Sequence, residues 1–338
     1  MTFLKYMKKK NLIILGIDTS CDDTCAAIIK NNTVLSNIVR TQQIHKKFGG
    51  VVPELASILH LKHIVYVVKN AILKAKITTN AINAIAFTKF PGLIGSLLVG
   101  SAFAKSLAMC WKIPLISVNH IQAHILANFL EGVHSTNPNF PFISLSISGG
   151  HTNIIKVKDF LEMKILGSSN DISLGNLFDN IAKVLGFQYP WGRIIEKYAQ
   201  LGNSKKFCFN KPKVKNLNFS FSGLQTKLLY FLKKKIKNNS EFVSQNINDI
   251  CASFQDTVFE ILFDKLNKTV QKTGIKNIVV SGGISSNIGL QKFFSEKSIE
   301  NNWKTFFPKS EFSTDNAAMI ALVGKLKYER NLFDKFYD

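Results

Sequence analysis

Two histidines and one aspartate are the residues whose types could build a metal centre. His120 and His124 stand four positions apart, so on a helix both imidazoles project from one face and can grip one cation. They follow an apolar run at 113–118 that predicts a strand, and ligands gather beyond the carboxyl ends of strands in open α/β sheets. Asp315 is the candidate third ligand. Two ordinary surface histidines and a helix N-cap aspartate would give the same pattern.

One metal-dependent class is not supported, namely the zinc proteases that carry a His-Glu-x-x-His helix. Those enzymes need a glutamate directly after the first histidine as general base. Ile121 occupies that position in this chain.

A cluster of carboxylates marks the first polar turn of the sequence. Asp18, Asp22 and Asp23 follow the apolar run at 12–17. Carboxylates in such a turn can orient a water molecule, a cation or an acceptor amine. The plainer interpretation is a solvated acidic turn at the end of a strand, because Asp favours turns.

Two Ser-Gly-Gly turns offer backbone amides to an anion. They are Ser148–Gly150 and Ser281–Gly283, and each follows an apolar run. Because no side chain blocks the approach, amides of such turns can point at phosphate oxygens. The second turn also opens a helix, whose N-terminus favours an anion. One such turn is commonly just a bend, whereas two indicate a nucleotide held between two lobes.

A basic and aromatic stretch is a candidate nucleic-acid contact. Residues 205–215 and 218–225 interleave lysines with phenylalanines, a mixture that suits phosphate contact and base stacking. An exposed basic loop before a strand has the same composition. We expect Lys233–Lys237 to be a solvated helix face.

The elements that must position these residues follow a repeated pattern. Residues 12–29 and 142–155 each read as an apolar strand, a small polar turn and a second apolar strand. Their spacing of roughly 130 residues indicates a duplicated lobe. We therefore expect lobes at 11–135 and 136–330, and the last helix, from about 315, could pack back on the first lobe.

Helices alternate with strands inside each lobe, which predicts an α/β class with a mixed sheet in each. The expected helices are 53–76, 93–111 and 250–272, and the expected strands are 82–87, 113–118 and 278–281.

The net charge and the cysteine content indicate what kind of partner and what kind of compartment this protein has. The chain has 338 residues, 46% of them apolar, and a formal charge of +21, which attracts polyanions. Base-composition drift toward AT-rich codons would raise the lysine count in the same way. Five scattered cysteines without a CxxC pair argue against a disulfide framework. With no secretory signal and no apolar run of about 20 residues, we expect a soluble cytoplasmic protein without a membrane partner.

Eight motifs in order resemble one known family, the tRNA threonylcarbamoyladenosine transferases, once named O-sialoglycoprotein endopeptidases. The resemblance covers about residues 12–326. The motifs lie at 16–24, 49–57, 91–100, 120–124, 148–152, 219–223, 282–287 and 314–316.

This resemblance implies a fold and a metal. The fold would be two ribonuclease H-like lobes of the actin, Hsp70 and sugar-kinase (ASKHA) type, with a cleft between them. One divalent ion, Fe(II) or alternatively Zn(II), would be held by His120, His124 and Asp315.

The resemblance also implies a reaction and a set of partners. The family transfers threonylcarbamoyl from threonylcarbamoyl-adenylate to N6 of adenosine 37 in tRNAs that read codons beginning with A. It works with a metal-free paralogous subunit and a small ATPase. Substrate contacts would carry over to Ser146, Ile147, Ser148, Gly149, Gly150, Asp179, Gly192, Asn287 and, on the ribose side, Glu196.

We expect Asp22 and Asp23 to position or deprotonate the attacking amine. Several positions depart from the family pattern, namely Gln122, Ala123, Asp23, Asn176, Asn180, Trp191, Arg193 and Gln225. Three other functions fit less well: a carbamoyltransferase for another acceptor, a sugar kinase, and a catalytically silent scaffold subunit.

Overall fold

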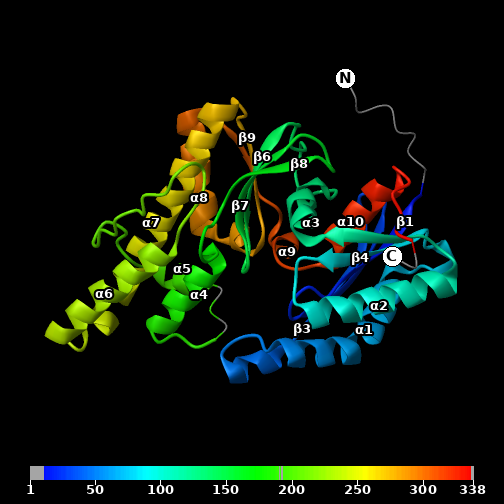
Figure 1. The fold of residues 1–338 in the computed structure, drawn as a ribbon, viewed down its shortest axis with the longest axis horizontal. Helices are drawn as coiled ribbons and strands as arrows, with labels where there is room; N and C mark the ends of the chain where they lie inside the picture. Colours follow the sequence, from blue (N-terminus) through cyan, green and yellow to red (C-terminus); the bar gives the residue numbers. More distant parts are fainter. Residues whose placement is uncertain (1–10, 190, 192, 336–338) are drawn as a thin grey trace. The chain divides into compact units, whose positions relative to one another are not determined.

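The computed structural model describes residues 11–189, 191 and 193–335, which form two compact units (Figure 1). The first unit comprises the chain up to 137 together with the segment from 309 onward, and the second comprises 138–308.

The first unit is built on a five-stranded sheet in the order β3-β2-β1-β4-β5. Strands β1, β2 and β3 run antiparallel, whereas β4 and β5 run parallel to β1. The strands are β1 Ile13–Asp18, β2 Asp23–Lys30, β3 Thr33–Thr41, β4 Ala84–Phe90 and β5 Leu115–Asn119.

Helices cover both faces of this sheet, which explains why its strands read as continuous apolar runs. Leu15 and Ile17 of β1 pack with the helices α1 and α2, while Gly16 between them faces α10. A Cβ on Gly16 would lie 2.2 Å from the carbonyl oxygen of Ala317, so only glycine allows this approach. The helices of the unit are α1 Pro53–Ala75, α2 Ile94–Trp111, α3 His120–Leu126, α9 Ser310–Ser313 and α10 Ala317–Tyr328, with short 3-10 turns at Gln43–Phe48, Thr79–Ala81 and Ala127–Phe129.

The second unit repeats this topology. Its sheet has the order β10-β9-β6-β7-β8, again with three antiparallel strands followed by two parallel ones. The predicted duplication and the mixed α/β class are therefore confirmed. The strands are β6 Phe142–Ile147, β7 Thr152–Val157, β8 Met163–Ser168, β9 Asn277–Ser281 and β10 Lys304–Phe306.

Five helices and one 3-10 turn complete the described part of the second unit. Its core joins Leu145 and Ile147 of β6 to buried residues of α4, α6 and α7, among them Phe254. These elements are α4 Leu174–Val184, α5 Ile194–Ala199, α6 Ser222–Asn238, α7 Phe242–Thr273, η4 Gly283–Ser286 and α8 Ile288–Asn301.

Most expected elements lie within a few residues of the observed ones. The largest difference is α7, which begins at Phe242 and not at 250. Helix α2 is long and apolar enough to cross a membrane by length and composition alone. In this fold it packs through Ser96, Gly100, Ala104 and Ala108 inside the first unit.

Candidate active site

The two histidines are positioned by the junction between β5 and α3. Strand β5 ends at Asn119, whose side-chain oxygen accepts a hydrogen bond from the Gln122 amide at 3.0 Å and so caps α3. His120 and His124 then lie one turn apart on the same helix. Asp315 precedes α10, whose N-cap is the neighbouring Asn316. Asn316 and not Asp315 is therefore the N-cap, so the alternative interpretation of Asp315 does not hold, and its carboxylate contacts the two histidines.

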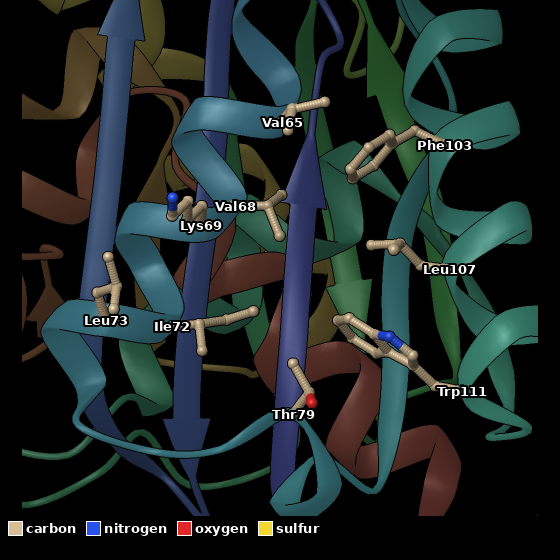
Figure 2. A pocket seen from close by; sticks show the side chains of 9 residues that line it. All are labelled: Val65, Val68, Lys69, Ile72, Leu73, Thr79, Phe103, Leu107 and Trp111. Carbon is tan, nitrogen blue, oxygen red and sulfur yellow. The ribbon is translucent and has the colours of Figure 1, made fainter.

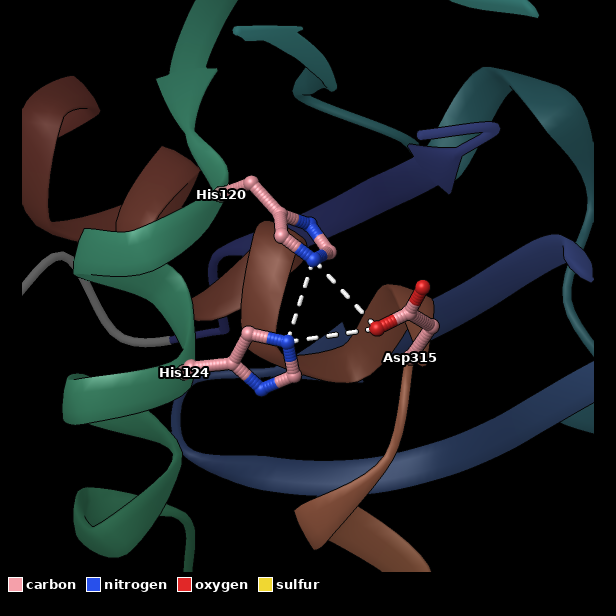
Figure 3. A group of neighbouring side chains, drawn as sticks. All are labelled: His120, His124 and Asp315. Carbon is pink, nitrogen blue, oxygen red and sulfur yellow. Dashed lines mark hydrogen bonds and ion pairs between the residues drawn. The ribbon is translucent and has the colours of Figure 1, made fainter. Parts of the chain in front are cut away.

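The three side chains converge on one point (Figure 3). The two Nε2 atoms are 3.0 Å apart, and Oδ1 of Asp315 lies 3.3 Å from Nε2 of His120 and 3.2 Å from Nε2 of His124. An ion with bonds of about 2.0–2.1 Å sets its ligands about 3.0 Å apart at right angles and about 3.3 Å apart at tetrahedral angles. The donor triangle therefore fits one divalent cation, and two imidazoles with one carboxylate suit Fe(II) or Zn(II).

Charges within the triad shift the pKa values of all three of its side chains. Burial alone would lower the pKa of His120, but the negative charges of Asp18 and Asp315 outweigh it and raise this pKa to about 9. Burial and the positive charge of His120 lower the pKa of His124. Burial alone would raise the pKa of Asp315, but the two histidines hold it well below its usual range. Ligation of a cation through Nε2 of His120 would therefore require this ring to lose a proton.

Asp18 lies behind the triad, as a partner of His120. Its carboxylate is fully buried, accepts a 2.7 Å hydrogen bond from Thr88 Oγ1, and lies 3.5 Å from Nδ1 of His120. Burial raises the pKa of Asp18. A carboxylate on the far nitrogen of a ligating histidine fixes its ring and tautomer. The sequence placed Asp18 only in an acidic turn, so this role was missed.

Asp22 lies on the β1–β2 turn, Asp23 begins β2, and both are half-buried. The turn is held by His60 of α1, whose Nε2 is 2.9 Å from the Cys21 carbonyl oxygen and whose Nδ1 is 2.8 Å from Thr24 Oγ1. Burial raises the pKa of Asp23 to about 7. A carboxyl group with this pKa can accept a proton near neutral pH.

In the second unit, the two Ser-Gly-Gly turns come from neighbouring strands. Ser146 on β6 is the parallel register partner of Ser281 on β9, so both turns leave the sheet at the same edge. A Cβ on Gly149, Gly150 or Gly283 would meet no atom within 4 Å. Each of these three residues therefore borders open space and can admit a ligand close to its backbone.

Helix α4 begins against the first of these turns. Its N-cap Ser173 donates a hydrogen bond to the Gly149 carbonyl, and a Cβ on Gly175 would lie 2.5 Å from the Cα of Gly149. Asp179 stands further along α4, where burial raises its pKa to about 6.

Glu196 and Asn287 meet at the start of α8. Oδ1 of Asn287 accepts from the Leu290 amide at 2.8 Å, and Oε1 of Glu196 accepts from the Ile288 amide at 2.6 Å. Both side chains are buried, so each already stabilises the N-terminus of α8. Gly192 lies outside the described residues.

The basic and aromatic stretch has a structural role. Lys205 pairs with Asp256 at 2.8 Å, Lys206 with Asp249 at 2.7 Å, and Lys211 with Asp264 at 2.7 Å, all on α7. Phe209, Phe219 and Phe221 are buried, with exposed fractions of 6%, 0% and 0%, and cannot stack on bases. Base stacking by these three rings is therefore ruled out, and Phe207 is the one phenylalanine of the stretch that is half-buried. The acidic residues recur at helical spacing along α7, a signal that could have indicated this pairing.

Two departures from the family pattern contact each other. Nδ2 of Asn180 donates to Oε1 of Gln225 at 3.2 Å, so the two departing side chains are hydrogen-bonded to each other. Trp191 donates from its indole nitrogen to the Phe187 carbonyl at 3.1 Å.

Two units of one topology, with three antiparallel and two parallel strands each, define the actin-like class of α/β proteins with ribonuclease H-like lobes. Solved structures agree. The fold matches a nucleotide-bound HypF with a TM-score of 0.63 and 15% identity, over 97% of this chain and 48% of that one. It also matches the activator of 2-hydroxyisocaproyl-CoA dehydratase from Clostridium difficile with a TM-score of 0.51 and 12% identity, over 96% of this chain and 99% of that one.

Comparison of the sequence with known proteins identifies the family. A profile described as tRNA N6-adenosine threonylcarbamoyltransferase matches residues 33–322. Proteins of that name from Christiangramia forsetii and Riemerella anatipestifer are each 51% identical, over 98% and 96% of this chain and 97% and 95% of their own lengths. The chain belongs to the tRNA N6-adenosine threonylcarbamoyltransferase family, an acyltransferase family, and the resemblance noted in the sequence is confirmed.

Proposed function

We propose that this protein transfers the threonylcarbamoyl group of threonylcarbamoyl-adenylate to N6 of adenosine 37 in tRNAs reading codons that begin with A. In this reaction a bond forms between N6 and the carbamoyl carbon, the bond from that carbon to the phosphate oxygen breaks, and AMP leaves. The proton lost by N6 passes to a base. The observation that carries the proposal is near full-length identity of 51% to relatives named for this activity, in a chain whose His/His/Asp triad is intact.

His120, His124 and Asp315 would hold one divalent cation, for which we propose Fe(II), with Zn(II) as the alternative. Bound there, the ion would supply Lewis acidity toward an oxygen of the mixed anhydride. Asp18 would keep the His120 ring in the ligating orientation through its contact with Nδ1.

Asp23 is the proposed acceptor of the N6 proton, and Asp22 would orient the amine. Support comes from the pKa of Asp23, which burial raises to about 7. A base with this pKa is partly ionised at neutral pH and can still accept a proton readily. The bonds of His60 to the turn would hold both carboxylates in place.

The adenylate would bind on the second unit. Backbone at Ser146, Ile147, Ser148, Gly149 and Gly150 would receive the phosphate, because glycines bordering open space let an anion approach the amides. Asp179, Gly192, Glu196 and Asn287 would contact the nucleoside. For Glu196 this means a second role beside capping α8.

The paralogous, metal-free subunit would dock on the outer face of α1 and α2. The two helices enclose an apolar groove of about 260 Å³, and Figure 2 shows their side chains pointing toward one another across it. On the same two helices, Val65, Tyr66, Ile94 and Leu98 expose 62%, 58%, 79% and 64% of their surface. Large exposed apolar patches mark interaction sites, and a subunit of like fold would present a similar helix pair. The small ATPase would join the same complex, which we place in the cytoplasm.

Mass spectrometry of nucleosides tests the proposed reaction. Unmodified tRNA would be incubated with threonylcarbamoyl-adenylate, the Fe(II)-loaded protein, the paralogous subunit and the small ATPase. Threonylcarbamoyladenosine at position 37 is the expected product. If the adenylate is consumed and the tRNA remains unmodified, the acceptor has been assigned wrongly.

A further inference from the structure

The outward face of α6 carries lysines around an exposed aromatic ring. Tyr230, Lys233, Lys234 and Lys237 stand at positions i, i+3, i+4 and i+7, which places them on one side of the helix. All four are exposed, and Tyr230 shows 70% of its surface. We call these four residues the α6 stripe.

The charge of the α6 stripe is not compensated. Helix α6 contains no Asp or Glu, and none of the three stripe lysines forms an ion pair with any described residue. The lysines at 205, 206 and 211 differ in this respect, since acidic residues of α7 neutralise them. The negative C-terminal end of the α6 dipole favours a lysine nearby, which would account for Lys237. It gives no reason for the exposed ring of Tyr230, seven residues earlier.

The stripe stands on a rigid support. Leu224, Leu228 and Leu232 bury the opposite side of α6 in the core of the second unit. At its start, Asp171 accepts hydrogen bonds of 2.6 Å from both Ser220 Oγ and Ser222 Oγ. The Phe-Ser-Phe-Ser-Gly motif is thereby explained as the clamp that fixes the beginning of α6.

We propose that the α6 stripe binds the sugar–phosphate backbone of the tRNA substrate, with Tyr230 stacking on an exposed base or packing against a ribose. Lysines supply the sequence-independent attraction to phosphates, and a single aromatic ring among them gives a stacking surface. A membrane surface fits less well, because α6 buries Leu224, Leu228 and Leu232 in its own unit. The aliphatic side chains that it leaves at the surface, Leu229 and Ile236, are only 36% and 43% exposed and form no continuous apolar face. This inference rests on the proposed function, since it names the surface used by the same substrate.

The test compares tRNA binding by a variant that lacks the three stripe lysines with tRNA binding by a control variant that lacks three exposed lysines elsewhere. The stripe variant is Lys233→Gln/Lys234→Gln/Lys237→Gln in the full chain, and its control is Lys268→Gln/Lys272→Gln/Lys276→Gln, three exposed lysines that also form no described ion pair. Binding of an unmodified tRNA transcript is measured by fluorescence anisotropy at several salt concentrations, with circular dichroism to verify folding. We expect the stripe variant to bind about tenfold or more weakly, with a salt slope reduced by about two to three, and the control to change little.

Two further variants and one vesicle assay complete the test. Tyr230→Ala should weaken tRNA binding about fivefold or more, whereas Tyr230→Phe should retain it. Unchanged affinity of the stripe variant, or equal loss in the control, overturns the inference. So does a stripe variant that binds tRNA normally but no longer binds vesicles of phosphatidylcholine and phosphatidylglycerol. Because binding is read without turnover, failure of the modification reaction with intact stripe-dependent binding would refute only the proposed function.

Discussion

Nδ1 of His120 lies 3.5 Å from Oδ2 of Asp18, a carboxylate with no solvent exposure. Thr88 Oγ1 and the Ser20 amide donate hydrogen bonds to Asp18 at 2.7 and 3.2 Å, whereas Nδ1 of His120 contacts it at ion-pair distance without a hydrogen bond. Since Asp18 ends β1 and His120 follows β5, the sheet itself sets this contact. Asp18 therefore links the rigid core of the first unit to the triad.

Asp18→Asn should weaken metal binding by about 10–100-fold, because the His120 ring loses its negatively charged partner. Fe(II) or Zn(II) affinity of the full chain can be measured by competition with a chelator. Glu296→Gln removes one negative charge from an exposed site on the second unit and should leave affinity unchanged. Equal affinities of the Asp18 variant and the wild type would contradict this role.

Metal affinity should rise with pH up to about 9. The metal-free His120 is protonated below its pKa of about 9 and must lose that proton to ligate. Each added pH unit below this value should strengthen binding about tenfold, with close to one proton released per ion. Calorimetry in buffers of different ionisation enthalpy counts the protons. No release at pH 7 would show that His120 is already neutral.

Asp23→Asn should abolish most transfer activity and yet stabilise the fold. Burial raises the pKa of Asp23 to about 7, above its unfolded value near 3.9, so the folded state prefers the protonated form. Stability from this group is present at low pH and is lost as pH rises through about 7. The amide should thus gain about 0.5–2 kcal/mol of unfolding free energy at pH 8 and nothing at pH 4, measured by urea denaturation. A loss of stability at pH 8 would oppose this interpretation.

Glycine substitutions separate a ligand-facing position from a packing position. Gly150→Ala should weaken adenylate binding with an unchanged melting temperature, because its Cβ would meet no protein atom within 4 Å. Gly175→Ala should destabilise the second unit, since its Cβ would lie 2.5 Å from Gly149 Cα. Thermal denaturation with and without a non-hydrolysable adenylate analogue measures both. Normal analogue binding by Gly150→Ala would remove the turn from the proposed site.

Val65→Glu/Leu98→Glu should prevent binding of the paralogous subunit, because burying two unpaired carboxylates in an apolar interface is costly. Ile299→Glu, on a residue of the second unit that is 84% exposed, is the matched control and should bind normally. Size-exclusion chromatography of the mixed subunits gives the result. Complex formation by the double variant would place the interface elsewhere.

The helices and strands, and the pairing of His120 with His124 on one helix face, could be predicted from the sequence. Strand periodicity and a four-residue spacing are signals carried by neighbouring residues. The sequence also identified Asp315 as the third candidate ligand. What it could not predict were long-range contacts, such as the burial of Asp18 beside Thr88, 70 positions away. The pairing of the 205–211 lysines with α7 was missed for the same reason, and base stacking was assigned to a loop in which Phe209, Phe219 and Phe221 are buried.

The most direct measurement is the initial rate of threonylcarbamoyladenosine formation as Fe(II) is added to metal-free protein. If His120, His124 and Asp315 hold one essential ion, the rate should rise linearly and level off at one equivalent. His124→Ala should stay inactive across the same range. A rate that ignores added metal, or a His124→Ala variant that turns over normally, would contradict the account.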